Sequence, residues 1–227
     1  MVRRPKKSWR SKVLFLDFKK FVPRTSQRQK EYQVRVTQRG VYRTAEEAEE
    51  PWASAPHGRR NRPGGAGAFS WGLVVGARKV WAHGELSANY KGPEVAKWLK
   101  QKVAPTLKAA KVGRTYTFRT DRDPCLTGAV GKEALKALPC PHELAEAHMQ
   151  AAMPHDFSIW HKVQSTIVEE EADWPPSQRT ESRASYKARV GRIVRNLDGD
   201  YIKKVCASVY NRAQAIVEAK GYRHKAD

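Results

Sequence analysis

Apolar residues dominate one short run near the start of the chain, residues 13–18, where only Asp17 breaks the pattern. Continuous rather than alternating apolar character is typical of a strand covered on both faces. Residues 32–36 alternate, as a partly exposed strand does. Two more runs, 68–75 and 79–86, are separated by a three-residue turn. They predict a β-hairpin.

Helical spacing begins after Gly92-Pro93, since proline is tolerated in the first turn of a helix. We expect Pro105 to kink or end this helix. A strand follows at residues 115–118, and a helix is predicted for 126–138. The segment 139–155 has no clear pattern.

The last third of the chain is helical by the same criterion. A helical run begins at Asp156, a Trp-Pro-Pro-Ser linker starts at Trp174, and amphipathic helices are predicted for 182–197 and 200–220. The order of elements favours an α/β fold, an RNase H-like mixed sheet flanked by helices with a helical C-terminal extension.

Three regions are expected from this order. Residues 1–11 form a basic N-terminal tail, 12–172 the RNase H-like domain, and 173–227 the helical extension packed on it. Within the domain, residues 44–68 are rich in Gly, Pro and Arg and predict a flexible loop. The strand at 32–36 is an extra element with no firm place in the sheet.

The charge indicates the kind of partner. The 227 residues include 43 Lys+Arg and 23 Asp+Glu, a formal net charge of +20, which favours a polyanion such as DNA, RNA or an anionic membrane. No apolar run is long enough for a membrane span, and no secretory signal is recognised. We therefore expect no membrane partner and no small-molecule substrate. The basic start of the chain is also compatible with nuclear import.

The cysteines indicate a reducing compartment, because Cys125, Cys140 and Cys206 are widely spaced and odd in number. A zinc site could be imagined from the first two with His142, His148 and His155. The close pairs of ligands typical of zinc sites are missing, so zinc is not predicted.

Three aspartates are the candidate chemistry. Asp17 ends an apolar run, Asp121 opens the turn TDRDP after a strand, and Asp156 follows Asp121 after thirty-four residues. Carboxylates from different elements can bind two divalent ions about 3.5–4 Å apart, the arrangement used for phosphodiester chemistry. The plainer alternative stays open, in which Asp156 caps a helix and Asp121 with Asp123 shapes a turn.

Several segments together resemble the catalytic domain of mariner-like DDE/D transposases, especially divergent protist-type copies. VLFLDFKKF is similar to the first-strand segment, TDRDP to the turn of the second acidic residue, and HDFSIWHKVQ to the helix of the third. RGVYR, YKGP and the closing WPPSQRTESRASYKARV stretch also resemble family segments. The patches cover nearly the whole chain.

The resemblance implies a function. It makes Asp17, Asp121 and Asp156 the catalytic metal ligands for Mg²⁺ or Mn²⁺, with Asp123 orienting the turn. It implies DNA strand cleavage and strand transfer in the nucleus, on transposon ends or target DNA, by a homodimer.

Three departures bear on activity. No helix-turn-helix precedes the first strand in this sequence, AHMQAAMPH replaces the usual segment before the third acid, and Arg122 stands where the family has Asn. The chain is therefore expected to be an active or a decayed copy.

Basic residues outside the acidic motifs are candidates for DNA contact. The Gly-Pro loop offers Arg59, Arg60 and Arg62, and the C-terminal helices offer cations that include Arg183, Lys187 and Arg192. Two alternatives to the enzyme remain, a catalytically inactive transposase-derived DNA-binding protein and an unrelated basic protein associated with ribonucleoprotein. The enzyme and its inactive derivative both predict that the three aspartates converge in the fold, whereas the unrelated protein does not. Metal-dependent nicking of DNA would separate the enzyme from the inactive derivative.

Overall fold

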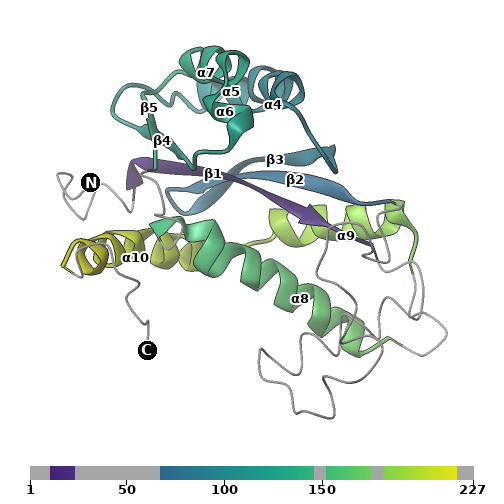
Figure 1. Ribbon diagram of the computed structural model, residues 1–227. Coiled ribbons are helices and arrows are strands. Elements are labelled where there is room, and N and C mark those ends of the chain that lie inside the picture. The colour runs from purple at the N-terminus through teal and green to yellow at the C-terminus, as the bar shows by residue number, and fades with distance from the viewer. Residues whose placement is uncertain (1–10, 24–66, 146–151, 175–180, 219–227) are drawn as a thin grey trace, which may run out of the picture.

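The computed structural model describes residues 11–23, 67–145, 152–174 and 181–218 (Figure 1). The predicted strand at 32–36 lies outside the described residues. So do Arg59, Arg60, Arg62 and nearly all of the predicted loop 44–68.

The centre of the fold is a five-stranded sheet of order β3-β2-β1-β4-β5. Strand β1 (Val13–Phe21) is its middle strand, antiparallel to β2 (Phe69–Gly76) and parallel to β4 (Thr117–Thr120). At the edges, β3 (Lys79–Ser87) is antiparallel to β2, and β5 (His142–Leu144) is parallel to β4. The sheet is therefore mixed, with the predicted hairpin on one side of β1.

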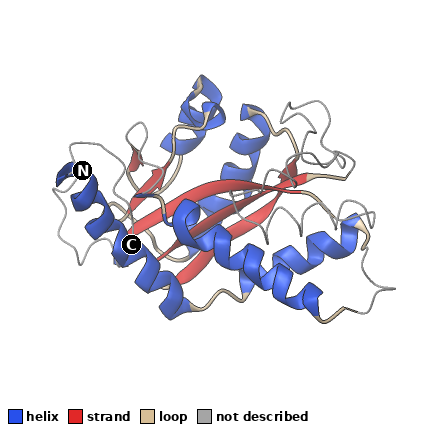
Figure 2. Ribbon diagram, turned by 60° about the horizontal axis from the view of Figure 1, so that its bottom comes forward, coloured by secondary structure: helices blue, strands red, loops and turns tan. Residues whose placement is uncertain are grey.

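Helices cover both faces of the sheet, as Figures 1 and 2 show. The upper layer in Figure 1 contains α4 (Gly92–Trp98), η1 (Leu99–Val103), α5 (Ala104–Ala109), α6 (Pro124–Thr127) and α7 (Ala129–Lys136). The lower layer contains η3 (His155–Ile159), α8 (Trp160–Ala172), α9 (Arg183–Arg195) and α10 (Gly199–Glu218). The predicted sandwich of helices around a mixed sheet is confirmed.

Strand β1 divides two hydrophobic cores, because successive side chains of a strand point to opposite faces. Leu14 and Leu16 are fully buried in the core under the upper helices, while Val13 and Phe15 are buried in the core above the lower helices. This two-sided burial explains the continuous apolar run in the sequence.

Of the two outcomes predicted for Pro105, a kink or an end of the helix, the end is wrong. The chain stays helical to Ala109 because the turn before the proline widens to the five-residue π-helix η1. The Ala104 amide bonds to the Leu99 carbonyl, five residues back. A widened turn accommodates a residue that lacks an amide proton and crowds the preceding turn.

The predicted helix at 126–138 is two short helices. The backbone of Gly128 is extended, so α6 ends there and α7 begins. The two pack so closely that a Cβ on Gly131 would stand 2.1 Å from the Cys125 carbonyl oxygen, which only glycine avoids. The predicted strand at 115–118 is found as β4, two residues later.

Candidate active site

Two of the three predicted aspartates lie side by side on the sheet. Leu16 of β1 pairs with Thr120 of β4 in a parallel register. Asp17 is the next residue of β1, and Asp121 is the first residue after β4. Neighbouring parallel strands thus bring together two acids that are about a hundred residues apart in the sequence.

The third aspartate comes from the lower layer. Asp156 lies in η3, immediately before α8, and its side chain is exposed. Trp160, the first residue of α8, donates its indole N–H to Asp17 Oδ2 over 2.6 Å. This bond ties the start of α8 to β1. The three acids interact electrostatically in each pairing, Asp17 with Asp156, Asp17 with Asp121, and Asp156 with Asp121.

Burial and repulsion from neighbouring carboxylates raise the pKa of all three carboxyl groups, and for Asp121 the neighbour is Asp123. For Asp17, which is only 9% exposed, burial is the largest cause, followed by repulsion from Asp156. The Trp160 bond opposes them, and the pKa of Asp17 still rises to about 7. Burial also raises the pKa of Asp121 and of Asp156, and Lys19 partly offsets the effect on Asp156.

The turn after β4 is held by a chain of hydrogen bonds. The Asp123 amide donates to Asp121 Oδ1 over 3.1 Å. The Asp123 carboxylate accepts the Cys125 amide at 2.7 Å, which caps α6, and accepts the Tyr90 hydroxyl at 2.7 Å. Asp123 therefore shapes the turn that carries Asp121, as its place beside Asp121 in the sequence suggested. The sequence does not predict this hydrogen bond of Tyr90, although its segment YKGP resembles a segment of the family.

Trp160 has a role that the sequence does not reveal. The residue is 3% exposed and packs in the lower core against Phe21 and the ring of His155. Its bond to Asp17 joins residues 143 positions apart, and sequence spacing does not predict such a contact. His155, next to Asp156, is fully buried, and burial lowers its pKa to about 3 despite the nearby backbone of Leu73. The lowered pKa favours a neutral imidazole, which packs against the Trp160 ring.

The donor chemistry of the cluster fits a divalent cation. Carboxylate oxygens are the ligands that Mg²⁺ and Mn²⁺ prefer, and a cation would relieve the repulsion that raises the three pKa values. Within the described ranges, no three His, Cys, Asp or Glu side chains stand in a ready metal-holding arrangement. The acids therefore share a region without forming a preassembled ligand set, and binding an ion requires their side chains to turn toward it.

The predicted DNA contacts on the C-terminal helices are largely engaged within the protein. Arg183 and Lys187 both pair with Glu85 of β3, and Arg192 pairs with Glu170 of α8. Their charges are thus partly neutralised, which a count of lysines and arginines along the sequence does not show.

The architecture defines a class. A mixed five-stranded sheet flanked by helices, with an acid on the first strand, one after the fourth and one before a later helix, has the RNase H-like arrangement. No protein-family model matches the chain. No curated protein matches it either.

Solved structures do match. The catalytic domain of Mos1 mariner transposase superposes with a TM-score of 0.66 at 12% identity, covering 97% of this chain and 87% of that chain. A pre-cleavage Mos1 transpososome gives a TM-score of 0.66 at 14% identity, and a Mos1 strand transfer complex 0.65 at 15%, each covering 97% of this chain. This chain spans 59% of the transpososome chain. The fold is therefore that of a mariner transposase catalytic domain, and the structural resemblance predicted from the sequence motifs is confirmed.

Proposed function

We propose that the protein is a transposase catalytic domain, which cleaves DNA strands and transfers them with the help of divalent metal ions. The observation that carries the proposal is the pairing of β1 with β4 together with the Trp160–Asp17 bond, which brings Asp17, Asp121 and Asp156 from three different elements into electrostatic interaction. Clustered carboxylates that raise one another's pKa are costly without a cation, so the cluster is expected to serve one.

Each acid has a distinct support. Asp17 is fixed by the rigid central strand and by Trp160, Asp121 by the hydrogen-bonded turn before α6, and Asp156 by the start of α8. We assign all three as ligands of Mg²⁺ or Mn²⁺. When bound, two such ions stabilise charge on the attacking and leaving oxygens of a phosphodiester. The protein's part is to hold the carboxylates on elements that do not move relative to the sheet.

The partner follows from charge and fold. A net charge of +20 favours DNA, and the similar Mos1 structures include a transpososome and a strand transfer complex. We extend DNA binding, on transposon ends or target DNA, to this chain as part of the proposal, together with nuclear location and action as a homodimer. In the described part of the chain, no helix is long and apolar enough to cross a membrane.

A second function has support from one observation. The acids do not form a ready ligand set among the described residues, which favours a transposase-derived DNA-binding protein that has lost catalysis. Arg122 of the turn that carries Asp121 has a structural role in either case, because its side chain donates to the Ala145 carbonyl at 3.0 Å and so fastens the turn to the segment after β5.

A nicking assay decides between the two. Purified protein is incubated with supercoiled plasmid and Mn²⁺, and nicked product is measured for the wild type, for Asp121→Ala and for the surface control Asp200→Ala. We expect Asp121→Ala to lose roughly 100-fold or more of the rate, the effect of losing several kcal/mol of charge stabilisation, and the control to match the wild type. Equal nicking by all three proteins would refute catalysis by this cluster. No nicking by wild type would favour the inactive DNA-binding protein.

A further inference from the structure

The two helical layers differ in how their positive charges are compensated. In the lower layer, four of the nine lysines and arginines of the described helices have acidic partners. Arg189 pairs with Glu171 and Glu181, and Arg192 with Glu170. Arg183 and Lys187 reach across to Glu85 of β3. Nearly half of the positive charge of this layer is therefore engaged in ion pairs that hold the fold together.

The upper layer carries positive charge that the fold does not use. Six exposed lysines share this property, five in its helices and Lys111 in the turn after α5, and we call them the upper lysine face: Lys97, Lys100, Lys108, Lys111, Lys132 and Lys136. Among the described residues only Lys100 of this set has an ion pair, with Glu133 at 3.5 Å, and both partners are at least half exposed. Such an exposed pair contributes little.

The acids of this layer do not neutralise the face. Helices α4 to α7 contain only two, Glu94 and Glu133. Glu94 accepts both the Ser87 amide and the Ser87 hydroxyl at 2.6 Å, so its carboxylate is turned to the end of β3. Glu133 is the exposed partner of Lys100. The remaining lysine charge is open to solvent.

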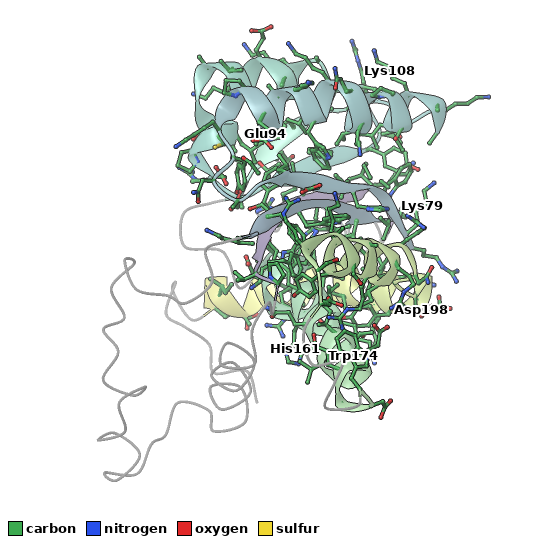
Figure 3. The ribbon with its side chains drawn as sticks, turned by 90° about the vertical axis from the view of Figure 1, so that its right-hand side faces the viewer. Lys79, Glu94, Lys108, His161, Trp174 and Asp198 are labelled. Carbon is green, nitrogen blue, oxygen red and sulfur yellow. The ribbon has the colours of Figure 1, made fainter. Side chains whose placement is uncertain are left out.

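The lysines lie on adjoining helices. The Lys100–Glu133 contact places η1 beside α7, and Lys132 and Lys136 are four residues apart on one face of α7. Lys108 belongs to the outer layer of helices in Figure 3, on the opposite side of the sheet from His161 and Trp174. The helical run α4–η1–α5 spans eighteen residues, or about 27 Å, which is comparable to several phosphates along a duplex.

We propose that the upper lysine face binds the phosphate backbone of duplex DNA without reading its sequence. The inference rests on the proposed function for its choice of DNA as partner. It names a surface for DNA binding whose lysines are not among the DNA contacts expected from the sequence. Lysine ammonium groups without exposed aromatic side chains among them favour phosphate contact over base contact.

The face is connected to the candidate active site. Tyr90, two residues before α4, is bonded to Asp123 in the turn that carries Asp121. The segment just before α4 is therefore tied to the turn that carries Asp121, and Lys97, Lys100 and Lys108 follow along the helical run from α4 to α5.

The test compares two sets of four charge removals in the full-length protein. The first replaces Lys97, Lys108, Lys132 and Lys136 by Gln. The control replaces Lys162, Arg195, Lys203 and Lys204 by Gln, the same loss of charge from residues of the lower layer that have no ion pair among the described residues. Binding to a short fluorescent DNA duplex is measured by anisotropy over a range of salt concentrations in EDTA, so that no metal ion contributes.

We expect the first variant to bind about tenfold or more weakly near 0.1 M salt, with a log–log salt slope smaller by up to about 3. The control should bind within about twofold of wild type. Equal losses in both variants would mean that bulk charge alone attracts DNA, and would overturn the proposal. A loss confined to the control, or no loss in either variant, would overturn it as well.

Two further measurements keep the outcome specific. Binding to anionic phospholipid vesicles is measured in parallel. If the first variant binds vesicles more weakly but binds DNA as wild type does, the upper lysine face binds a membrane surface and the DNA proposal is overturned. Thermal melting checks that both variants stay folded, since all eight substituted residues are at the surface or partly exposed. Nicking by Asp121→Ala tests the catalytic proposal independently, so either idea can fail while the other stands.

Discussion

Trp160 donates its indole N–H to Asp17 Oδ2 over 2.6 Å, and this bond joins the central strand to the first residue of α8 across 143 positions of sequence. The bond has two consequences. It positions α8, and with it Asp156, against the sheet. It also favours the ionised form of a carboxyl group that burial and neighbouring acids push toward protonation.

Replacing Trp160 by Phe keeps most of the packing and removes the donor. The pKa of Asp17 should then rise further above about 7, by roughly one to two units, because a hydrogen bond to a charged group contributes about 1.5–3 kcal/mol. Protons would compete more strongly with the cation. We expect Mn²⁺ binding, measured by calorimetry, to weaken about tenfold at pH 7 and to recover near pH 9.

The matched control is Trp174→Phe, which changes a tryptophan that stacks on Arg189 away from the acids. Its Mn²⁺ affinity should follow the wild type at every pH. If Trp160→Phe binds Mn²⁺ as wild type does at pH 7, the indole does not support the ionised state of Asp17.

The raised pKa of Asp17 predicts how stability depends on pH in the absence of metal. Between the unfolded value near 3.9 and the folded value of about 7, the folded state keeps a proton that the unfolded state releases. Stability should therefore fall as pH rises from 4 to 7. Asp17→Asn cannot lose this proton, so its melting temperature should fall less over the same range. Melting curves in EDTA at pH 4.5 and 7.5 measure the difference, and parallel slopes for the two proteins would contradict the prediction.

Much of the scaffold could be predicted because its signals are local. The run at residues 13–18 is apolar on both faces because β1 is the middle strand between two helical layers, and the hairpin and the two C-terminal helices show clear periodicity. The short strand β5 was missed, since its three residues are all half-buried and give no alternation. The break at Gly128 and the widened turn before Pro105 depend on packing that sequence spacing does not show.

The site was harder to predict than the scaffold. Asp17 and Asp121 could be predicted as site residues because each stands at the end of an apolar, strand-like run, where a carboxylate is unusual. The partners of these acids, Trp160 and Tyr90, are distant in sequence and carry no motif for the contact they make. The ion pairs of Arg183, Lys187 and Arg192 likewise depend on the fold, since composition counts charges without showing which are paired.

Tyr90 should support the turn that holds Asp121. Tyr90→Phe deletes the hydroxyl that donates to Asp123 Oδ2 and leaves the ring against Phe18. Asp123 would still accept the Cys125 amide at the start of α6. It would lose the hydrogen bond that joins the turn to the segment just before α4. We expect a modest loss of stability, about 1–2 kcal/mol, and a Mn²⁺ affinity several-fold weaker than that of wild type. Calorimetric Mn²⁺ titration and chemical denaturation measure the two effects.

Tyr116→Phe is the control for this change, because that ring lies under the Lys12 ammonium, away from the turn. It should alter neither the Mn²⁺ affinity nor the free energy of unfolding by much. A Tyr90→Phe protein that loses stability but binds Mn²⁺ normally would limit Tyr90 to a structural role.

Arg189 is the residue whose loss should cost the most stability outside the two cores. The side chain is 8% exposed and bonds to Glu171 at 2.7 Å, to Glu181 at 2.8 Å and to the Ile167 carbonyl at 3.2 Å. Arg189→Met preserves volume but leaves two nearly buried carboxylates without their cation. Breaking such a buried pair costs about 3–5 kcal/mol, so the melting temperature should fall by roughly 10 °C.

Two comparisons separate this buried network from ordinary surface pairing. Arg192→Met removes a half-exposed partner of Glu170 and should change stability by less than about 1 kcal/mol. Adding Glu171→Gln and Glu181→Gln to Arg189→Met removes the stranded charges, so the triple variant should regain part of the loss. The deficit of Arg189→Met should also shrink near pH 4, where glutamates protonate. If the triple variant is no more stable than Arg189→Met at pH 7, the cost lies in lost packing rather than in unpaired charge.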